Sequence, residues 1–454
     1  MWPATLATVW AGAPAIAADP GPMPVQRCTL DGFIQLPGSD VCLAISGYAR
    51  LDVTAIDKNW LGTDGYEVDG IAVNGNSVAP SGVVPTISTG FRDDTIEMYS
   101  EGRLSFDARS ATDYGTVRAY VQAEVVDDES RSGGDVELRH AYVQFGNWLF
   151  GKTYSTILLS EAGPDYSDPY TVVGDNSTNI RRNQIRYTQP LGQDLSLRLA
   201  VEDQNYDTPT AAIVGLGPLM PLVAPGVTSY AVDNDANDWP DLVAALRWSR
   251  DGVGSWQVAG ALHQNSFVEV PSFGNLPVPG AGDSDLGFAL LFGLALDLPT
   301  GEGDTFTFLA NNTDGASQYL QDVFGDSANI TWGRCSPTSN CILDRVTKWS
   351  VVSSLTRAIS AQWQATVGAG YAETNYGALG TATSGLLGAP GVLDVASLEI
   401  FANVVWNPVP KTTFMLDVHY GRIDFGGFDL DATLPGVQSA QGAWAATFEV
   451  TRRF

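Results

Sequence analysis

The chain has 454 residues, with 51 Asp or Glu against 24 Lys or Arg, so its formal net charge is −27. This acidity argues against a nucleic-acid partner, because phosphates must be neutralised by Lys and Arg. An apolar content of 44% excludes a disordered chain. The longest nearly uninterrupted apolar run, 286–296, is far shorter than the roughly 20 residues that a membrane helix needs. With only 3 His and 4 Cys, we expect no metal, no cofactor and no enzymatic activity.

The N-terminus has the character of a targeting segment. Small and apolar residues end in Ala15-Ile16-Ala17, the pattern of a signal-peptide cleavage site. A basic opening region is absent, so we expect residues 1–17 to be a truncated signal peptide; a buried first strand or a frayed tail is the alternative. Residues 18–42 are then expected to be a periplasmic N-terminal segment that precedes the main domain.

The cysteines fit an exported protein, because disulfides persist in oxidising compartments. Four cysteines allow three pairings, and the simplest joins sequence neighbours: Cys28 with Cys42, and Cys335 with Cys341. No C-x-x-C spacing occurs, so zinc or thioredoxin-type chemistry has no support.

Alternating apolar and polar residues recur along the whole chain and predict strands with one face in an apolar medium and one in water. Leu416 and Val418 share one parity, for example, while Asp417 and His419 share the other. No helical period of comparable length occurs. Sixteen strands are predicted, at 43–53, 95–108, 116–126, 136–145, 148–154, 181–189, 195–202, 241–250, 254–264, 286–296, 304–310, 347–356, 361–372, 396–406, 411–421 and 441–454.

The connections between these strands alternate strictly in length. Every odd-numbered connection is longer than every even-numbered one, which is typical of outer-membrane barrels with short periplasmic turns and long external loops. Within hydrocarbon every backbone polar group must be paired inside the protein, so strands can cross a membrane only as a closed barrel. We therefore predict an all-β fold, a 16-stranded antiparallel transmembrane β-barrel over residues 43–454, with the polar parity, including His263 and His419, facing a hydrated lumen.

Residues 28–52, CTLDGFIQLPGSDVCLAISGYARLD, resemble the start of alphaproteobacterial (Rhizobiales-type) outer-membrane porins. The alternating last strand, which ends in Phe454, extends the resemblance loosely over the chain. The resemblance implies a 16-stranded barrel, typically a homotrimer, integral to the bacterial outer membrane and in contact with lipid and lipopolysaccharide. It also implies that Cys28 and Cys42 are the family's N-terminal cysteine pair and that small hydrophilic solutes and ions pass through.

In general porins the third external loop folds inward and constricts the lumen, and here that loop is 155–180. It has no Lys or Arg, and its acids are Glu161, Asp165, Asp168 and Asp175. Opposed charges across a constriction would impose ion selectivity. The alternative is that the wall arginines pair along the strands, as Arg103 could with Glu101 or Asp107. Inward-parity candidates on the wall are Arg50, Arg103, Arg118, Arg139, Arg182, Arg186, Arg198 and Arg247.

These observations predict a general diffusion porin with a mild cation preference, because the net charge focuses cations. A substrate-specific channel for sugars or other small solutes is the main alternative; it would need an inward aromatic series, and none is evident in the sequence. A barrel hydrolase is disfavoured because no Ser, His and Asp spacing supports a triad. A soluble secreted β-protein would not have so uniformly apolar an outward face, and a 22-stranded plugged transporter would need a longer chain.

Overall fold

The computed structural model describes Cys28 and residues 32–57, 66–68, 71–74, 77–80, 96–127, 135–167, 172–177, 180–204, 229–231, 239–266, 284–320, 331–336, 339–375, 393–426 and 440–454. The predicted signal peptide and Asp168 lie outside these residues. So do the side chains of Cys335 and Cys341, although their backbones lie in described strands. None of the helices in the described ranges is long and apolar enough to cross a membrane.

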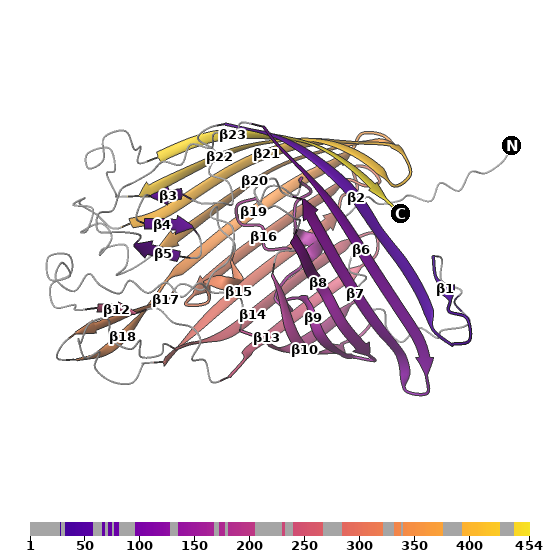
Figure 1. Cartoon of the computed structure of the whole chain (residues 1–454), viewed down its shortest axis with the longest axis horizontal. Coiled ribbons are helices and arrows are strands. Elements are labelled where there is room, and N and C mark those ends of the chain that lie inside the picture. Colours follow the sequence, from indigo (N-terminus) through magenta and orange to yellow (C-terminus); the bar gives the residue numbers. More distant parts are fainter. Residues whose placement is uncertain are drawn as a thin grey trace.

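Sixteen antiparallel strands form one closed barrel (Figure 1), in agreement with the sequence prediction. Closure occurs at β2, which pairs with β6 on one side and with the last strand, β23, on the other. The barrel strands are β2 (Cys42–Ile56), β6 (Ile96–Thr112), β7 (Gly115–Asp127), β8 (Asp135–Phe145), β9 (Trp148–Tyr154), β10 (Arg181–Pro190), β11 (Leu195–Glu202), β13 (Asp241–Arg250), β14 (Gly254–Ser266), β15 (Ser284–Asp297), β16 (Thr305–Asp314), β19 (Thr347–Ala358), β20 (Trp363–Asn375), β21 (Leu393–Val409), β22 (Thr412–Gly426) and β23 (Ala440–Arg453). Each overlaps one of the sixteen predicted ranges.

Shorter elements lie outside the barrel wall. Two small sheets form in the long connections, at the end of the barrel opposite the C-terminus in Figure 1. One contains β3 (Tyr66–Val68), β4 (Ile71–Asn74) and β5 (Ser77–Pro80), and the other contains β12 (Ser229–Ala231), β17 (Thr331–Ser336) and β18 (Ser339–Arg345). Two single 3-10 turns, η1 (Ser160–Ala162) and η2 (Ser317–Tyr319), also lie in long connections, and both contain buried residues.

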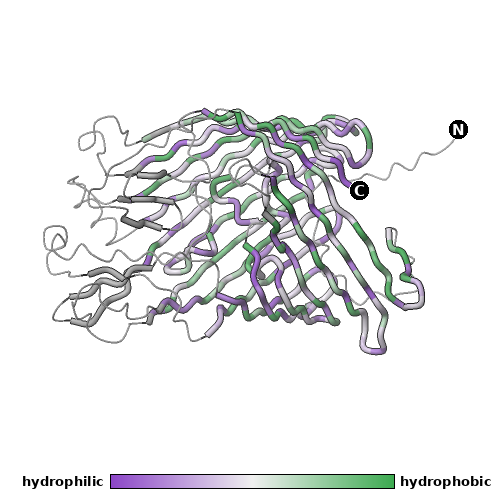
Figure 2. Tube along the Cα trace, viewed as in Figure 1, coloured by the Kyte–Doolittle hydropathy of each residue, from purple (hydrophilic) through white to green (hydrophobic). Residues whose placement is uncertain are grey.

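The two parities of each strand face different surroundings, as Figure 2 shows by the alternation of green and purple along the tubes. In β22, Leu416 on the outer face is 53% exposed, whereas Asp417 and His419 on the inner face are fully buried within the barrel. An outer surface of Leu, Val, Ile and aromatic side chains suits lipid, because hydrocarbon solvates them. Paired outer rings, such as Trp363 with Trp406 at 5.7 Å, sit where strands approach the short turns.

One part of the lumen-facing wall differs from the polar surface predicted. On β11 to β16 the inner parity includes a group of buried Ala, Val and Leu side chains among its polar ones, namely Ala200, Val243, Ala245, Ala259 and Leu291. These side chains are buried because the apolar start of the third long connection packs over them. The barrel therefore has a local hydrophobic core inside its lumen.

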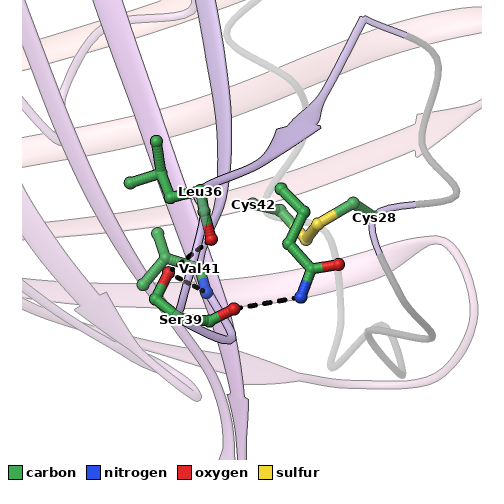
Figure 3. The surroundings of a disulfide bond; sticks show 6 residues. Cys28, Leu36, Ser39, Val41 and Cys42 are labelled. Atoms are coloured by element: carbon green, nitrogen blue, oxygen red, sulfur yellow. Dashed lines mark hydrogen bonds between the residues drawn. A yellow bond between two sulfur atoms is a disulfide. The ribbon is translucent and has the colours of Figure 1, made fainter.

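The predicted Cys28–Cys42 disulfide is confirmed (Figure 3). It closes a loop with a sequence separation of 14, with the two Cα atoms 5.3 Å apart. Within that loop β1 (Ile34–Gln35) pairs with the start of β2, and the backbone N–H of Leu36 donates to the carbonyl of Val41 at 3.0 Å. The disulfide thus fastens the N-terminal segment to the first barrel strand.

Candidate functional site

The third long connection, residues 155–180, is named the inner loop here; of it, 168–171 and 178–179 lie outside the described residues. Its two ends are joined, because the backbone N–H of Ser155 donates to the carbonyl of Ile180 at 2.9 Å. Ile157, Leu158 and Leu159 are almost completely buried against the small apolar side chains of β11 to β16. The loop therefore folds into the barrel, as the resemblance implied.

Polar side chains on the wall bind the first half of the inner loop. The Glu202 carboxylate accepts from the Ser155 hydroxyl and from the Thr156 backbone N–H, both at 2.6 Å. The Gln257 amide donates to the carbonyls of Ile157 at 2.8 Å and Leu158 at 3.0 Å. Because these wall groups are buried, they satisfy backbone groups of the loop that water could not reach.

The second half of the loop is bound by strands on the far side of the barrel. Asp417 accepts from the backbone N–H of Ser167 at 2.7 Å, and Glu399 accepts from that of Val173 at 2.8 Å. His419 lies between the two carboxylates, 2.6 Å from Glu399 and 3.0 Å from Asp417. The inner loop is thus held from β11 round to β22.

A glycine on β20 marks how closely the loop approaches the wall. A Cβ atom added at Gly370 would overlap the carbonyl oxygen of Val173. Beside it, Asn311 donates to the carbonyl of Gly174, a residue whose φ of +83° is in the region that favours glycine. The inner loop is therefore seated on the wall through direct backbone contact.

The acids predicted for the constriction lie in three different environments. Glu161 binds Arg247 with both carboxylate oxygens, at 3.1 Å for Nη1 to Oε2. Burial opposes ionisation, but the Arg247 guanidinium outweighs it and holds the pKa of Glu161 below its usual range. Asp175 is buried and accepts from the Tyr166 hydroxyl at 2.8 Å and from the backbone N–H of Ser177 at 2.8 Å, so it stabilises the loop itself.

Asp165 is a loop acid that lies near two acids of the wall, Glu449 and Asp417. Its carboxylate accepts from the Gln364 amide at 3.0 Å, and its backbone carbonyl accepts from Asn403. Burial first, and then the charges of Glu449 and Asp417, raise the pKa of Asp165 to about 7, against an opposing effect of Arg453. Its charge therefore changes close to neutral pH.

Four of the eight predicted wall arginines pair with acids of their own or a neighbouring strand. Arg103 bridges Glu101 at 3.0 Å and Glu124, and Arg139 also binds Glu124 at 2.9 Å. Arg50 binds Asp52 at 2.8 Å and contacts Glu101. Arg118 binds Asp107 at 2.9 Å. Pairing along the strands, which the sequence left as the alternative, is thus what the structure shows for these four.

The remaining wall arginines have other surroundings. Arg182 is buried and donates to the backbone carbonyls of Asp203 and Gln204, each at 3.3 Å, beside the ring of Tyr319. Arg186 and Arg198 line a pocket together with Arg118 and Arg247 beneath the inner loop. Of the predicted loop acids that are described, only Glu161 forms an ion pair with a predicted wall arginine.

Sequence reasoning missed the groups that hold long connections in the lumen. The two inward histidines were expected to hydrate it, yet His419 binds Glu399 and Asp417, and His263 binds Asp241 at 2.7 Å. Asp241 in turn accepts from the buried Tyr319 hydroxyl at 2.6 Å. Carboxylates two residues from a histidine on one inward parity, as in Asp417-x-His419, were the available signal. Within the described ranges no group of three or more His, Cys, Asp or Glu could hold a metal ion.

An inward aromatic series, which the sequence did not reveal, runs across β2, β6, β7 and β8. The rings of Tyr120 and Tyr142 lie 5.4 Å apart, and arginines stack beside several members of the series. Arg103 lies 4.8 Å from the ring centre of Tyr48. The members are Tyr48, Tyr99, Tyr120 and Tyr142. Each ring was hidden in the sequence because its neighbours on the same strand face are polar or charged.

A closed barrel of sixteen antiparallel strands, apolar outside and constricted by an inward-folded loop, defines an outer-membrane porin. The chain belongs to the family described as Porin subfamily, whose profile matches residues 14–445. It is an integral protein of the outer membrane. The family and location predicted from residues 28–52 are thereby confirmed.

Known relatives agree with this assignment. The chain is similar to porin Omp2b of Brucella melitensis, 26% identical over 243 residues that make up 52% of this chain and 55% of that protein. It is also similar to outer membrane protein y4fJ of Sinorhizobium fredii, 29% identical over 31% of this chain and 36% of that protein. The chain thus spans about a third to a little over half of the length of these two relatives.

Among solved structures, the outer membrane channel DcaP of Acinetobacter baumannii superimposes with a TM-score of 0.62. It is 16% identical, and the match covers 91% of this chain and 97% of that one. At this identity the likeness supports the barrel fold alone.

Proposed function

We propose that the protein is a general diffusion porin, a water-filled channel for passive passage of small hydrophilic solutes and ions across the outer membrane. The observation that carries the proposal is the inner loop, which is bound inside a closed barrel by Glu202, Gln257, Glu399 and Asp417. A barrel of about 16 strands is wide enough for an aqueous lumen, and a loop fixed within it limits the size of the solutes that pass. Catalysis is not part of the proposal.

A mild cation preference is the second part of the proposal. The wall arginines on β2, β6, β7 and β8 share carboxylates of adjacent strands, so that side of the lumen has no large excess of positive charge. On the other side Asp165 lies within electrostatic reach of Asp417 and Glu449. Together with the net charge of −27, these acids favour cations in the lumen.

A substrate-specific channel for sugars remains a second candidate, and the inward tyrosine series favours it. Aromatic faces bind the apolar faces of sugar rings, and the adjacent arginines would donate to hydroxyl groups. A saturable block of ion current by one sugar would favour this candidate, whereas conductance insensitive to sugars favours general diffusion.

The proposed partners are further copies of the chain and membrane lipid, as the porin family and the apolar outer surface of the barrel indicate. We propose a homotrimer surrounded by lipid and, in the outer leaflet, lipopolysaccharide. The trimer can be tested by the mobility of unheated and heated protein in a denaturing gel. Reconstitution in planar bilayers tests the channel itself: stepwise conductance, with a reversal potential in a KCl gradient that favours K⁺, is the expected result. Absence of steps from correctly folded protein would refute the proposal.

A further inference from the structure

Beneath the inner loop lies a pocket in which four arginines converge. Arg118 of β7, Arg186 of β10, Arg198 of β11 and Arg247 of β13 line it. Tyr142, Gln144 and Thr153 complete the wall side, and Ser155, Leu158 and Ser160 of the inner loop cover it. The pocket therefore joins the loop to the wall.

Strand register shows why the arginines meet. Arg198 pairs with Thr188, which is two residues from Arg186, and it also pairs with Ala245, which is two residues from Arg247. Diagonal neighbours on one sheet face are about 7–8 Å apart at Cα, within reach of long side chains. All three face the lumen, so Arg186, Arg198 and Arg247 form a diagonal row across three adjacent strands.

Within the described part of the chain, Asp107 and Glu161 are two carboxylates that bind members of this arginine cluster. Asp107 binds Arg118 but is shared with Arg109. Glu161 binds Arg247 through both oxygens, in the bidentate arrangement that a small oxyanion would also adopt. Glu161 belongs to the inner loop, and its carboxylate binds Arg247 of the wall in the position that an external oxyanion would take.

The pocket also has a defined place along the channel. Arg118 lies three residues from the short turn before β7, and Arg247 lies three residues from the short turn after β13. Short turns are at the periplasmic end of an outer-membrane barrel. A solute that has passed the inner loop would therefore meet the pocket before leaving on the periplasmic side.

We propose that this pocket is a subsite for small oxyanions, phosphate or carboxylate groups with two acceptor oxygens, and that Glu161 competes with them for Arg247. The subsite deepens the proposed channel function and rests on it. A bound oxyanion is held by the diagonal arginines and the polar side chains Gln144 and Ser160. An oxyanion offers two separate acceptor oxygens that match the two parallel N–H groups of a guanidinium, whereas chloride offers a single acceptor atom.

The test is a ³¹P NMR titration of inorganic phosphate with the full-length protein in a nonionic detergent, where saturable line broadening reports binding without any need for conduction. Malonate tests carboxylate binding, which is measured by its displacement of bound phosphate or by its own saturable binding. We expect saturation by at least one of the two oxyanions, and about tenfold weaker binding for Arg186→Gln and Arg198→Gln, because each removes charged hydrogen bonds. Arg250→Gln, at an exposed arginine that ends β13 beside a short turn, is the matched control and should leave the affinity unchanged.

Glu161→Gln should change the oxyanion affinity in the opposite direction from the arginine variants. A folding defect cannot produce such an increase in affinity. Removing the internal carboxylate should tighten oxyanion binding several-fold, while Glu302→Gln in an exposed turn should not. No saturation by either oxyanion, or equal affinity in wild type, Arg186→Gln and Arg198→Gln, would overturn the subsite. Protein that binds phosphate yet forms no conducting steps would instead refute the channel function, so the two failures are distinguishable.

Discussion

Neutralising Asp165 should lower the cation preference of the channel in a way that depends on pH. Its carboxyl has a pKa of about 7, raised by burial and by Glu449 and Asp417. It is therefore charged above neutral pH and mostly protonated at pH 5. Asp165→Asn removes a full charge at pH 9, about half a charge at pH 7 and almost none at pH 5.

The size of the effect follows from Coulomb's law. A cation passing roughly 6 Å from the carboxylate in water is stabilised by about 0.7 kcal/mol and an anion is destabilised by the same amount, so the cation-to-anion permeability ratio changes about tenfold. We expect Asp165→Asn to lower the K⁺ to Cl⁻ permeability ratio about tenfold at pH 9, about threefold at pH 7 and not measurably at pH 5.

Reversal potentials in a tenfold KCl gradient across planar bilayers measure this ratio. The quantity to compare is the difference between variant and wild type at each pH, because this difference cancels any pH dependence of the rest of the protein. Glu302→Gln, which removes a charge from an exposed turn, is the matched control and should differ little from wild type at any pH. An equal effect of Asp165→Asn at pH 5 and pH 9, or none at pH 9, would refute the reasoning.

Three further predictions concern the loop, the N-terminus and the lipid face. Gly370→Ala should push Val173 off the wall and change single-channel conductance, while Gly102→Ala, where a Cβ meets nothing within 4 Å, should not; equal conductance in both would contradict a tightly seated loop. Cys42→Ser should free β1 but leave the barrel able to fold, because the disulfide closes only a local loop; loss of heat-modifiable gel mobility would show otherwise. Leu416→Arg should destabilise insertion by about 2–4 kcal/mol relative to Leu416→Ala in urea titrations in lipid, and equal stability would argue against lipid at this face.

Strand positions, faces and closure were predictable from the sequence because each is set by neighbours along the chain. Side chains alternate with a period of two, so Leu416 and Asp417 must face opposite sides wherever the strand lies. The long and short connections then order the strands, and unpaired edges in lipid are so costly that closure follows. The Cys28–Cys42 pair was accessible for the same reason, since its partners are close in sequence.

The contacts that make the constriction were decided by the tertiary structure. Ser167 and Asp417 are 250 residues apart, and no local pattern connects them. Parity placed Ala245 and His419 on the inner face, but only the packed loop determines that one lies in a hydrophobic core and the other in a carboxylate network. The same holds for the arginines: Arg103 and Arg247 share an inward parity, and their different partners depend on which acid the folded chain brings within hydrogen-bonding distance.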